Sequence, residues 1–214
     1  MKGSVLVTGG TTRLGKEIAE YLRADGWRVL TSSHRADAGA DLVADLSEPL
    51  GAARLYAEAL AALDGQPPDA LVNNAALFAD DEQVLRAVNL EAPKKLTMLM
   101  AGRETGRGAV VNILDCRARE GVYGETKQVL AEYTRKAAVM FAETLRVNAV
   151  APGPVLPPKD LHEPAGETLV GRPRPEDVAA AVSFLLEAKS TTGAIIPVDG
   201  GQGLLFGEDE RVSG

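Results

Sequence analysis

The chain of 214 residues is 45% hydrophobic and has a formal net charge of −7, which suffices for one sizeable core and predicts a single domain over residues 1–214. The acidic balance, without a long run of lysine and arginine, argues against a nucleic-acid partner, and the single cysteine, Cys116, excludes an internal disulfide and leaves us expecting no metal site. No stretch has the ~18 apolar residues of a membrane span or the pattern of a signal peptide, so we expect a soluble cytoplasmic protein without a membrane partner.

The first predicted strand and helix enclose a glycine-bearing turn. Val5, Leu6 and Val7 form the short apolar run of a strand that is buried on both faces, and apolar residues recur at helical spacing from Leu14 onward. The sequence TGGTTRLG between them, residues 8–15, places small residues where the backbone must turn sharply and a helix N-terminus points outward. Glycine and threonine are ordinary turn residues, but a turn after the first strand predicts a pyrophosphate site.

The rest of the chain alternates short apolar runs with helical periodicity. Predicted strands cover residues 4–8, 28–32, 42–44, 70–73, 109–114, 146–151 and 194–198. Predicted helices cover residues 13–25, 50–63, 81–103, 123–145 and 175–186. This alternation predicts an α/β Rossmann fold, a doubly wound, seven-stranded parallel sheet with helices on both faces.

Two connections lack a helical pattern. About ten residues, 33–42, separate the second and third strands, which is too few for a full helix with its turns, so we predict a bare loop there. Residues 152–174 are rich in proline and charge and predict a mobile surface loop that could act as a substrate lid.

Tyr123 and Lys127 lie one turn apart on a predicted helix, and therefore on the same face. A nearby positive charge lowers the pKa of a phenol from about 10, so we expect Tyr123 to be a usable proton donor near neutral pH. The same spacing is common on solvated helix faces, so the pair alone does not define a site.

Together with these residues, four further motifs resemble the short-chain dehydrogenase/reductase family from end to end. They are Asn73-Asn74-Ala75 after the fourth strand, Asn89 in the next helix, Pro152-Gly153 after the sixth strand and VDGG at 198–201. The resemblance implies a nicotinamide cofactor held by Thr8, Gly9, Leu14, Gly15, Asp45, Leu46, Asn74, Ala75, Lys127, Pro152 and Gly153. It also implies that Tyr123, Lys127 and Asn89 take part in catalysis.

One position departs from the usual family pattern. Asp115 stands where the family usually has serine, and the gap to Tyr123 is several residues shorter than usual. Aspartate here, Arg13 in place of the middle glycine of the turn, and Phe78 after the fourth strand resemble the branch of pteridine reductases and dihydromonapterin reductases. The resemblance implies that Asp115, Tyr123, Phe78 and Arg13 bind the substrate, with Phe78 as one wall of a slot for a flat pterin. We also expect Asp115 to be catalytic, as an anchor or proton relay for the ring nitrogens and amino group of the pterin. Asn89 would hold a water on the proton path.

The end of the second strand bears on the choice of cofactor. An acidic residue there would bind the ribose 2′-hydroxyl of NAD, whereas cationic residues accommodate the 2′-phosphate of NADP. This strand continues into His34 and Arg35, with no acid before Asp37, and Arg13 could reach the same phosphate from the first helix. We therefore expect NADPH.

The sequence thus predicts an NADPH-dependent reductase of a small molecule, a dihydropterin, that forms a homo-oligomer, either a dimer or a tetramer. Two alternatives stay open. The chain could be an NADPH-dependent carbonyl or 3-oxoacyl reductase, which would favour a neutral hydrogen-bond donor at position 115. It could also be a noncatalytic NADPH-binding sensor or scaffold. We expect no catalytic role for Cys116 or His162, because neither has a visible partner in the sequence.

Overall fold

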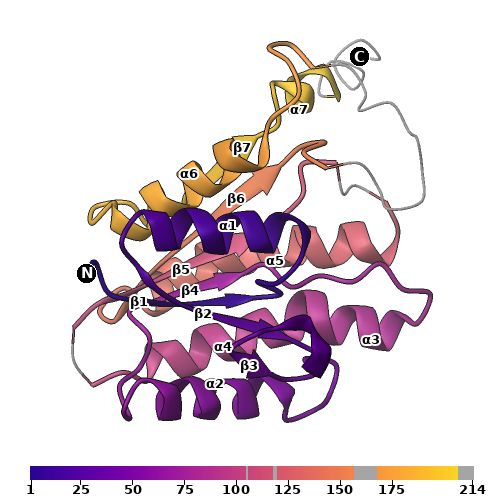
Figure 1. Ribbon diagram of the computed structural model, residues 1–214. Helices are drawn as coiled ribbons and strands as arrows, with labels where there is room; N and C mark the ends of the chain where they lie inside the picture. Colours follow the sequence, from indigo (N-terminus) through magenta and orange to yellow (C-terminus); the bar gives the residue numbers. More distant parts are fainter. Residues whose placement is uncertain (105, 118–119, 157–167, 207–214) are drawn as a thin grey trace.

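A computed structural model describes residues 1–104, 106–117, 120–156 and 168–206. Seven parallel strands form one sheet in the order β3-β2-β1-β4-β5-β6-β7 (Figure 1). The strands are β1 Ser4–Thr8, β2 Arg28–Ser33, β3 Leu42–Val43, β4 Ala70–Asn73, β5 Gly108–Ile113, β6 Leu145–Pro152 and β7 Ile195–Val198. The helices are α1 Arg13–Ala24, α2 Gly51–Ala62, α3 Glu82–Arg86, α4 Ala92–Ala101, α5 Gly121–Met140, α6 Pro175–Glu187 and α7 Gln202–Phe206, with the 3₁₀-helix η1 Ala36–Ala38 and the π-helix η2 Ala87–Glu91. The predicted doubly wound fold is confirmed.

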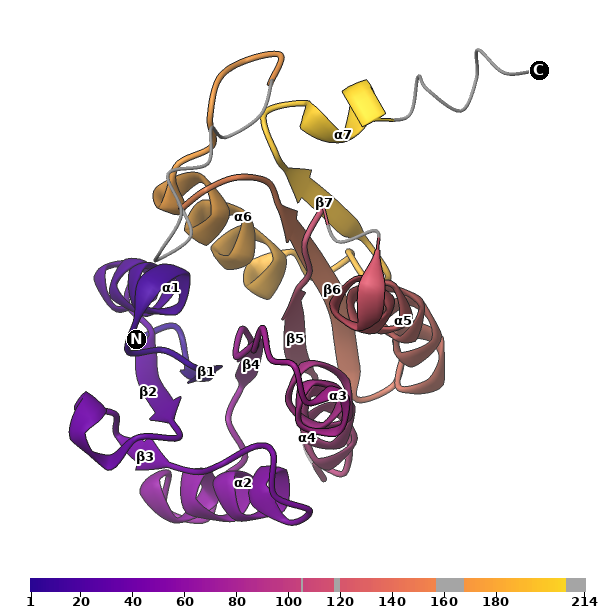
Figure 2. The same ribbon diagram turned by 90° about the vertical axis from the view of Figure 1, so that its right-hand side faces the viewer.

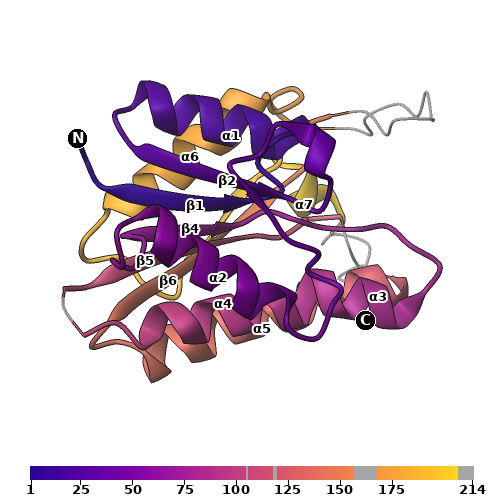
Figure 3. The ribbon, with the colours of Figure 1, turned by 60° about the horizontal axis from the view of Figure 1, so that its bottom comes forward.

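The two faces of the sheet carry separate cores, because side chains alternate along each strand. Val5 and Val7 of β1 pack with buried residues of α1 and α6, while Leu6 packs with those of α2, α4 and α5. Figure 3 shows α1 and α6 on one side of the sheet and α2, α4 and α5 on the other. The central strands are therefore apolar on both faces, as predicted for the first strand from its apolar run Val5 to Val7. In the described part of the chain, none of the helices is long and apolar enough to cross a membrane.

The strand order reverses between β1 and β4, and ligands of open parallel sheets bind outside the carboxyl ends of the strands at such a point. Figure 2 views the molecule from the side toward which the strands of Figure 1 point. The turn after β1 and the segments after β4, β5 and β6 all leave the sheet at this edge. The fold thus brings the predicted site residues to one edge.

Several predicted boundaries were wrong. The helix predicted over 81–103 is interrupted by η2, where one extra residue per turn shifts the helical phase. The loop predicted as bare contains η1, a single 3₁₀ turn closed by Gly39 at φ 67°. The helix predicted over 123–145 begins at Gly121 and ends at Met140, because Leu145 already pairs with Gly108 in the sheet. The short helix α7 was not predicted.

The predicted lid over 152–174 is described only in part, because its residues 157–167, including His162, lie outside the described residues. Leu169 and Val170 donate backbone hydrogen bonds to the carbonyl oxygen of Gly200, at 2.8 and 3.1 Å. The end of this connection is thus tied to the turn after β7.

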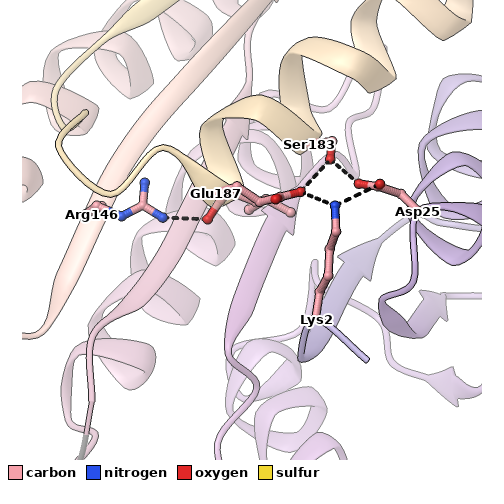
Figure 4. A network of polar contacts seen from close by, with 6 residues as sticks. Lys2, Asp25, Arg146, Ser183 and Glu187 are labelled. Carbon is pink, nitrogen blue, oxygen red and sulfur yellow. Dashed lines mark hydrogen bonds and ion pairs between the residues drawn. The ribbon is translucent and has the colours of Figure 1, made fainter.

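Polar contacts at the opposite edge of the sheet join α1 to α6 (Figure 4). Lys2 lies 2.8 Å from Asp25 and 2.5 Å from Glu187, and Ser183 donates to Asp25. Beside this cluster, the buried Arg146 of β6 donates to the carbonyl oxygens of Leu185 and Leu186 at 2.7 and 2.5 Å. Its guanidinium therefore satisfies carbonyl groups that the end of α6 leaves without helical partners.

Arg146→Met should destabilise the protein, because methionine preserves the apolar stem but leaves two buried carbonyl groups without a charged donor. We expect the free energy of unfolding to fall by about 3 kcal/mol. The melting temperature should then drop by roughly 6 to 12 °C. Arg54→Met, on the exposed face of α2, is the matched control and should shift the melting temperature by less than ~2 °C. Equal shifts in both variants would contradict this account of Arg146.

Candidate functional site

The turn after β1 is braced against β4 by Thr8 and Asn74. The backbone N–H groups of Asn74 and Ala75 both donate to Thr8 Oγ1 at 3.0 Å, and Asn74 Nδ2 donates to the carbonyl oxygens of Thr8 and Gly9. An added Cβ at Gly15 would lie 2.1 Å from the Gly9 oxygen. The turn and the start of α1 are therefore in direct backbone contact, and only glycine fits at position 15.

Arg13 begins α1 with a φ of 50°, in the left-handed region that side chains with a Cβ rarely adopt. The position matches the middle glycine of the family turn, so the backbone keeps the glycine conformation although the residue is arginine. Its side chain is exposed at the edge of the sheet. Leu14 instead packs against the core under α1.

The end of β2 presents His34 and Arg35, both exposed, on this edge. Arg35 is held by Asp37 through two hydrogen bonds, Nε to Oδ1 at 2.9 Å and Nη2 to Oδ2 at 2.7 Å. The predicted cationic end of β2 therefore carries its own carboxylate partner.

Asp45 and Leu46, predicted to hold the cofactor, follow β3. Asp45 accepts hydrogen bonds from Ser47 N and Oγ at 2.8 and 2.6 Å, and these bonds lower the pKa of its carboxyl group. Leu46 is a buried core residue under α2. Its side chain is therefore structural, and only its backbone could contact a ligand.

Asp115, Tyr123 and Lys127 come together at the carboxyl end of β5. The Tyr123 hydroxyl donates to Asp115 Oδ2 at 3.2 Å, and the other carboxylate oxygen accepts from the Arg117 N–H at 2.8 Å. Lys127 is buried, donates to the Ile113 carbonyl oxygen at 2.9 Å and has its Nζ 5.7 Å from the centre of the Tyr123 ring. The short segment between Asp115 and Tyr123 thus does bring the carboxylate to the phenol.

The expected lowering of the Tyr123 pKa was wrong for this state of the protein. Burial of the phenol, followed by the charge of Asp115 and its hydrogen bond, raises the pKa of Tyr123 above its ordinary value. Burial also lowers the pKa of Lys127 to about 8, partly offset by Asp115. Tyr123 is therefore a protonated phenol at neutral pH, beside an ammonium group that is easily neutralised.

Phe78 and Asn89 shape the segment after β4. The Phe78 ring stacks on Tyr123 with 4.1 Å between ring centres and an interplanar angle of 26°, while 78% of Phe78 stays exposed. Asn89, fully buried in η2, accepts from Leu77 N at 2.8 Å and donates to Leu77 O at 2.9 Å. Both polar groups of Asn89 thus bind the backbone of Leu77, the residue before Phe78, and the water-binding role expected from the sequence stays a prediction.

Two side chains at the site, Asn112 and Asp199, make hydrogen bonds that the sequence did not predict. Asn112 of β5 donates to Thr134 Oγ1 of α5 at 2.9 Å and accepts from Asn73 of β4 at 2.8 Å, which fixes α5 against the sheet. Asp199, after β7, accepts from Gly201 N and Gly203 N at 2.9 and 2.7 Å. Strand-end asparagines were the available signal for the first contact, but their partner on α5 lies in another part of the chain.

Pro152 and Gly153 lie beside this edge, where the Pro152 carbonyl accepts from Cys116 N at 3.0 Å and Gly153 N donates to Val198 O at 2.9 Å. A Cβ at Gly153 would lie 2.7 Å from the Cα of Asp199, so glycine is required for this packing. Burial, with smaller contributions from Asp199 and Asp115, raises the pKa of Cys116 to about 12. Its thiol therefore stays protonated at neutral pH. Among the described residues, no group of histidine, cysteine and acidic side chains is placed to hold a metal ion.

Comparison with known proteins shows that this chain is similar to oxidoreductases in sequence and in structure. A family model described as enoyl-(acyl carrier protein) reductase matches residues 11–202. The chain is 31% identical to the uncharacterized oxidoreductase YmfI of Bacillus subtilis over 94% of this chain and 99% of that protein. It is 30% identical to the rhamnolipids biosynthesis 3-oxoacyl-[acyl-carrier-protein] reductase of Pseudomonas aeruginosa, over 92% of this chain and 94% of that one. The crystal structure of FolM alternative dihydrofolate reductase 1 from Brucella canis, complexed with NADP, is 32% identical with a TM-score of 0.80 and 94% coverage of both chains.

The left-handed conformation of Arg13 predicts that Arg13→Gly is more stable than Arg13→Ala, since both remove the side chain but only glycine relieves the backbone. We expect a difference of about 1 kcal/mol. This corresponds to roughly 2 to 4 °C in melting temperature. At Lys16, in the right-handed part of the same helix, the order should reverse, with glycine less stable than alanine by about 1 kcal/mol. The same order at both positions would refute the assigned conformation.

Proposed function

The chain belongs to the short-chain dehydrogenase/reductase family of oxidoreductases, and from this premise we propose that it reduces the C=N bond of a dihydropterin with NADPH. The observation that carries the substrate choice is the carboxylate of Asp115 at 3.2 Å from the Tyr123 hydroxyl. A carbonyl reductase favours a neutral donor at this position, because a carboxylate repels the negative charge that develops on a carbonyl oxygen. The FolM structure, that of a dihydrofolate reductase with NADP, supports the pterin reading.

The turn between β1 and α1 fits a dinucleotide. No Cβ fits at Gly15, the start of α1 has no acidic residue in its first turn, and its N–H groups and positive dipole end face the carboxyl edge of the sheet. NADPH, when bound, supplies the hydride. We propose that it is held by residues at the strand ends and on α5: Thr8, Gly9, Arg13, Leu14, Gly15, His34, Arg35, Asp45, Leu46, Asn74, Ala75, Lys127, Pro152 and Gly153.

Tyr123 would donate the proton to the substrate. The phenol is protonated at neutral pH, as an ordinary tyrosine is, so the acid form is present when substrate arrives. The ammonium group of the buried Lys127 would stabilise the phenolate left behind. Asn89 would hold the segment that carries Phe78 and a water on the proton path.

A pterin suits the remaining surface. It presents N–H donors along one edge, which Asp115 can accept, and a flat face, which the exposed ring of Phe78 can cover. A carbonyl or 3-oxoacyl reductase is the second candidate, because a 3-oxoacyl reductase is among the similar proteins. A noncatalytic NADPH-binding protein is the third, and a turnover assay would separate it from both enzymes.

The cationic end of β2 predicts that NADPH binds at least tenfold more tightly than NADH, about 1.4 kcal/mol. Arg35→Asp should weaken NADPH binding far more than NADH binding, because only NADPH has a 2′-phosphate. Fluorescence titration of the purified protein measures both dissociation constants. Arg135→Asp, an exposed charge change on α5, is the control and should alter neither. Equal affinities of the wild type for the two cofactors would reject this assignment.

The pterin assignment predicts that Asp115→Ser and Phe78→Ala each lower kcat/KM for a dihydropterin at least tenfold. Asp115→Ser loses a charge-assisted hydrogen bond, which contributes about 1.5 to 3 kcal/mol, and Phe78→Ala loses the stacking face. NADPH oxidation with dihydrobiopterin, dihydromonapterin, dihydrofolate and several ketones is the measurement. Tyr123→Phe should lower turnover about 10²- to 10⁴-fold and gives the level without the proton donor.

Binding of NADPH should barely change in any of these variants. A wild type that reduces ketones but no dihydropterin would reject the pterin and favour the carbonyl reductase. Wild-type pterin activity in both Asp115→Ser and Phe78→Ala would also reject the pterin assignment.

A further inference from the structure

The first turn of α5 carries Tyr123 but is weakly fixed by the helix itself. The helix begins at Gly121, whose φ of 67° is left-handed, and the side chain of Glu120 makes no capping hydrogen bond. The first N–H groups of a helix also have no carbonyl partners in a preceding turn. The position of this turn must therefore depend on contacts from outside α5.

Lys127, one turn further on, is secured by burial and by its bond to Ile113. Besides the bond from the Tyr123 hydroxyl to Asp115, the first turn contacts the segment between β4 and α4. Tyr123 stacks on Phe78, and Glu125 accepts two hydrogen bonds from Arg86, Nη1 to Oε1 at 3.0 Å and Nη2 to Oε2 at 2.8 Å. A two-bond pair of this kind fixes orientation as well as distance.

Arg86 and Phe78 are themselves connected through Asn89. Arg86 is the last residue of α3 and directly precedes η2, in which Asn89 binds the peptide of Leu77 on both sides. Figure 2 shows α3 beside the start of α5, in agreement with the contacts between these helices. Residues 77–89 thus hold the first turn of α5 at two points, one aromatic and one ionic.

We propose that Arg86 and Glu125 are positioning residues, which fix the first turn of α5 and thereby aim the Tyr123 hydroxyl. The inference rests on the proposed function only in that Tyr123 donates the proton, whatever the substrate. Both side chains are more than one-third exposed, at 39% and 53%, so the pair contributes little to global stability. Its loss should therefore appear in turnover rather than in the melting temperature.

Steady-state kinetics of the full chain with NADPH, and with whichever dihydropterin or ketone the wild type reduces, test the proposal. Arg86→Gln and Glu125→Gln should each lower kcat about fivefold through misplacement of the proton donor, with an unchanged NADPH dissociation constant. The reversed pair, Arg86→Glu with Glu125→Arg, should recover most of the lost rate. Glu132→Gln removes an ion pair with Lys136 within α5, at 3.6 Å, and is the matched control that should keep the wild-type kcat.

Amide hydrogen exchange, measured without substrate, gives a readout that does not depend on activity. Arg86→Gln should speed exchange at residues 124–126, the first amides of α5 with helical partners, and leave residues 128–140 unchanged. Unchanged exchange at 124–126, or faster exchange with a wild-type kcat, would overturn the inference, as would a reversed pair that recovers nothing. If the wild type reduces none of the substrates, the proposed function fails. The exchange result alone then shows whether the Arg86–Glu125 pair fixes the first turn of α5.

Discussion

The direct contact between the backbone of Gly9 and the first turn of α1 at Gly15 is the constraint on which the candidate site depends. It brings the helix N-terminus onto the end of β1, where its unpaired N–H groups can face an anion. Asn74 then bonds to the same turn from β4, across the point where the strand order reverses. A side chain at position 15 would push α1 outward and separate these two halves of the cofactor edge.

The fold could be predicted from the sequence because its main signals are local. Apolar runs such as Val5 to Val7 and the helical spacing after Leu14 specify strands and helices, and the parallel sheet follows from their alternation. The π-helix at η2 could not be predicted in this way, since one extra residue barely disturbs an apolar pattern over twenty residues. The start of α5 at Gly121 was not predicted either, because a glycine ordinarily marks the end of a helix rather than its beginning.

The sequence predicted which candidate residues lie near one another at the edge of the sheet, but not their electrostatic environment. Sequence spacing placed Lys127 near Tyr123, and from this neighbour alone a lowered pKa of the phenol followed. Burial and the Asp115 carboxylate act in the opposite direction and are stronger. Burial depends on packing between distant segments, and the same holds for the stacking of Phe78 on Tyr123. Neither can be read from the spacing of residues along one helix.

The π-helix η2 limits where the segment before α4 can gain or lose residues. Its extra residue turns α3 about 100° relative to α4, compared with one continuous α-helix. Deleting a residue between Ala87 and Glu91 would restore regular backbone bonding and shorten the chain by one residue. It would also rotate Arg86 away from α5. A change of length at residues 79–80, between Phe78 and the N-cap Asp81 of α3, would leave this phase untouched, whereas a change of length within η2 would not.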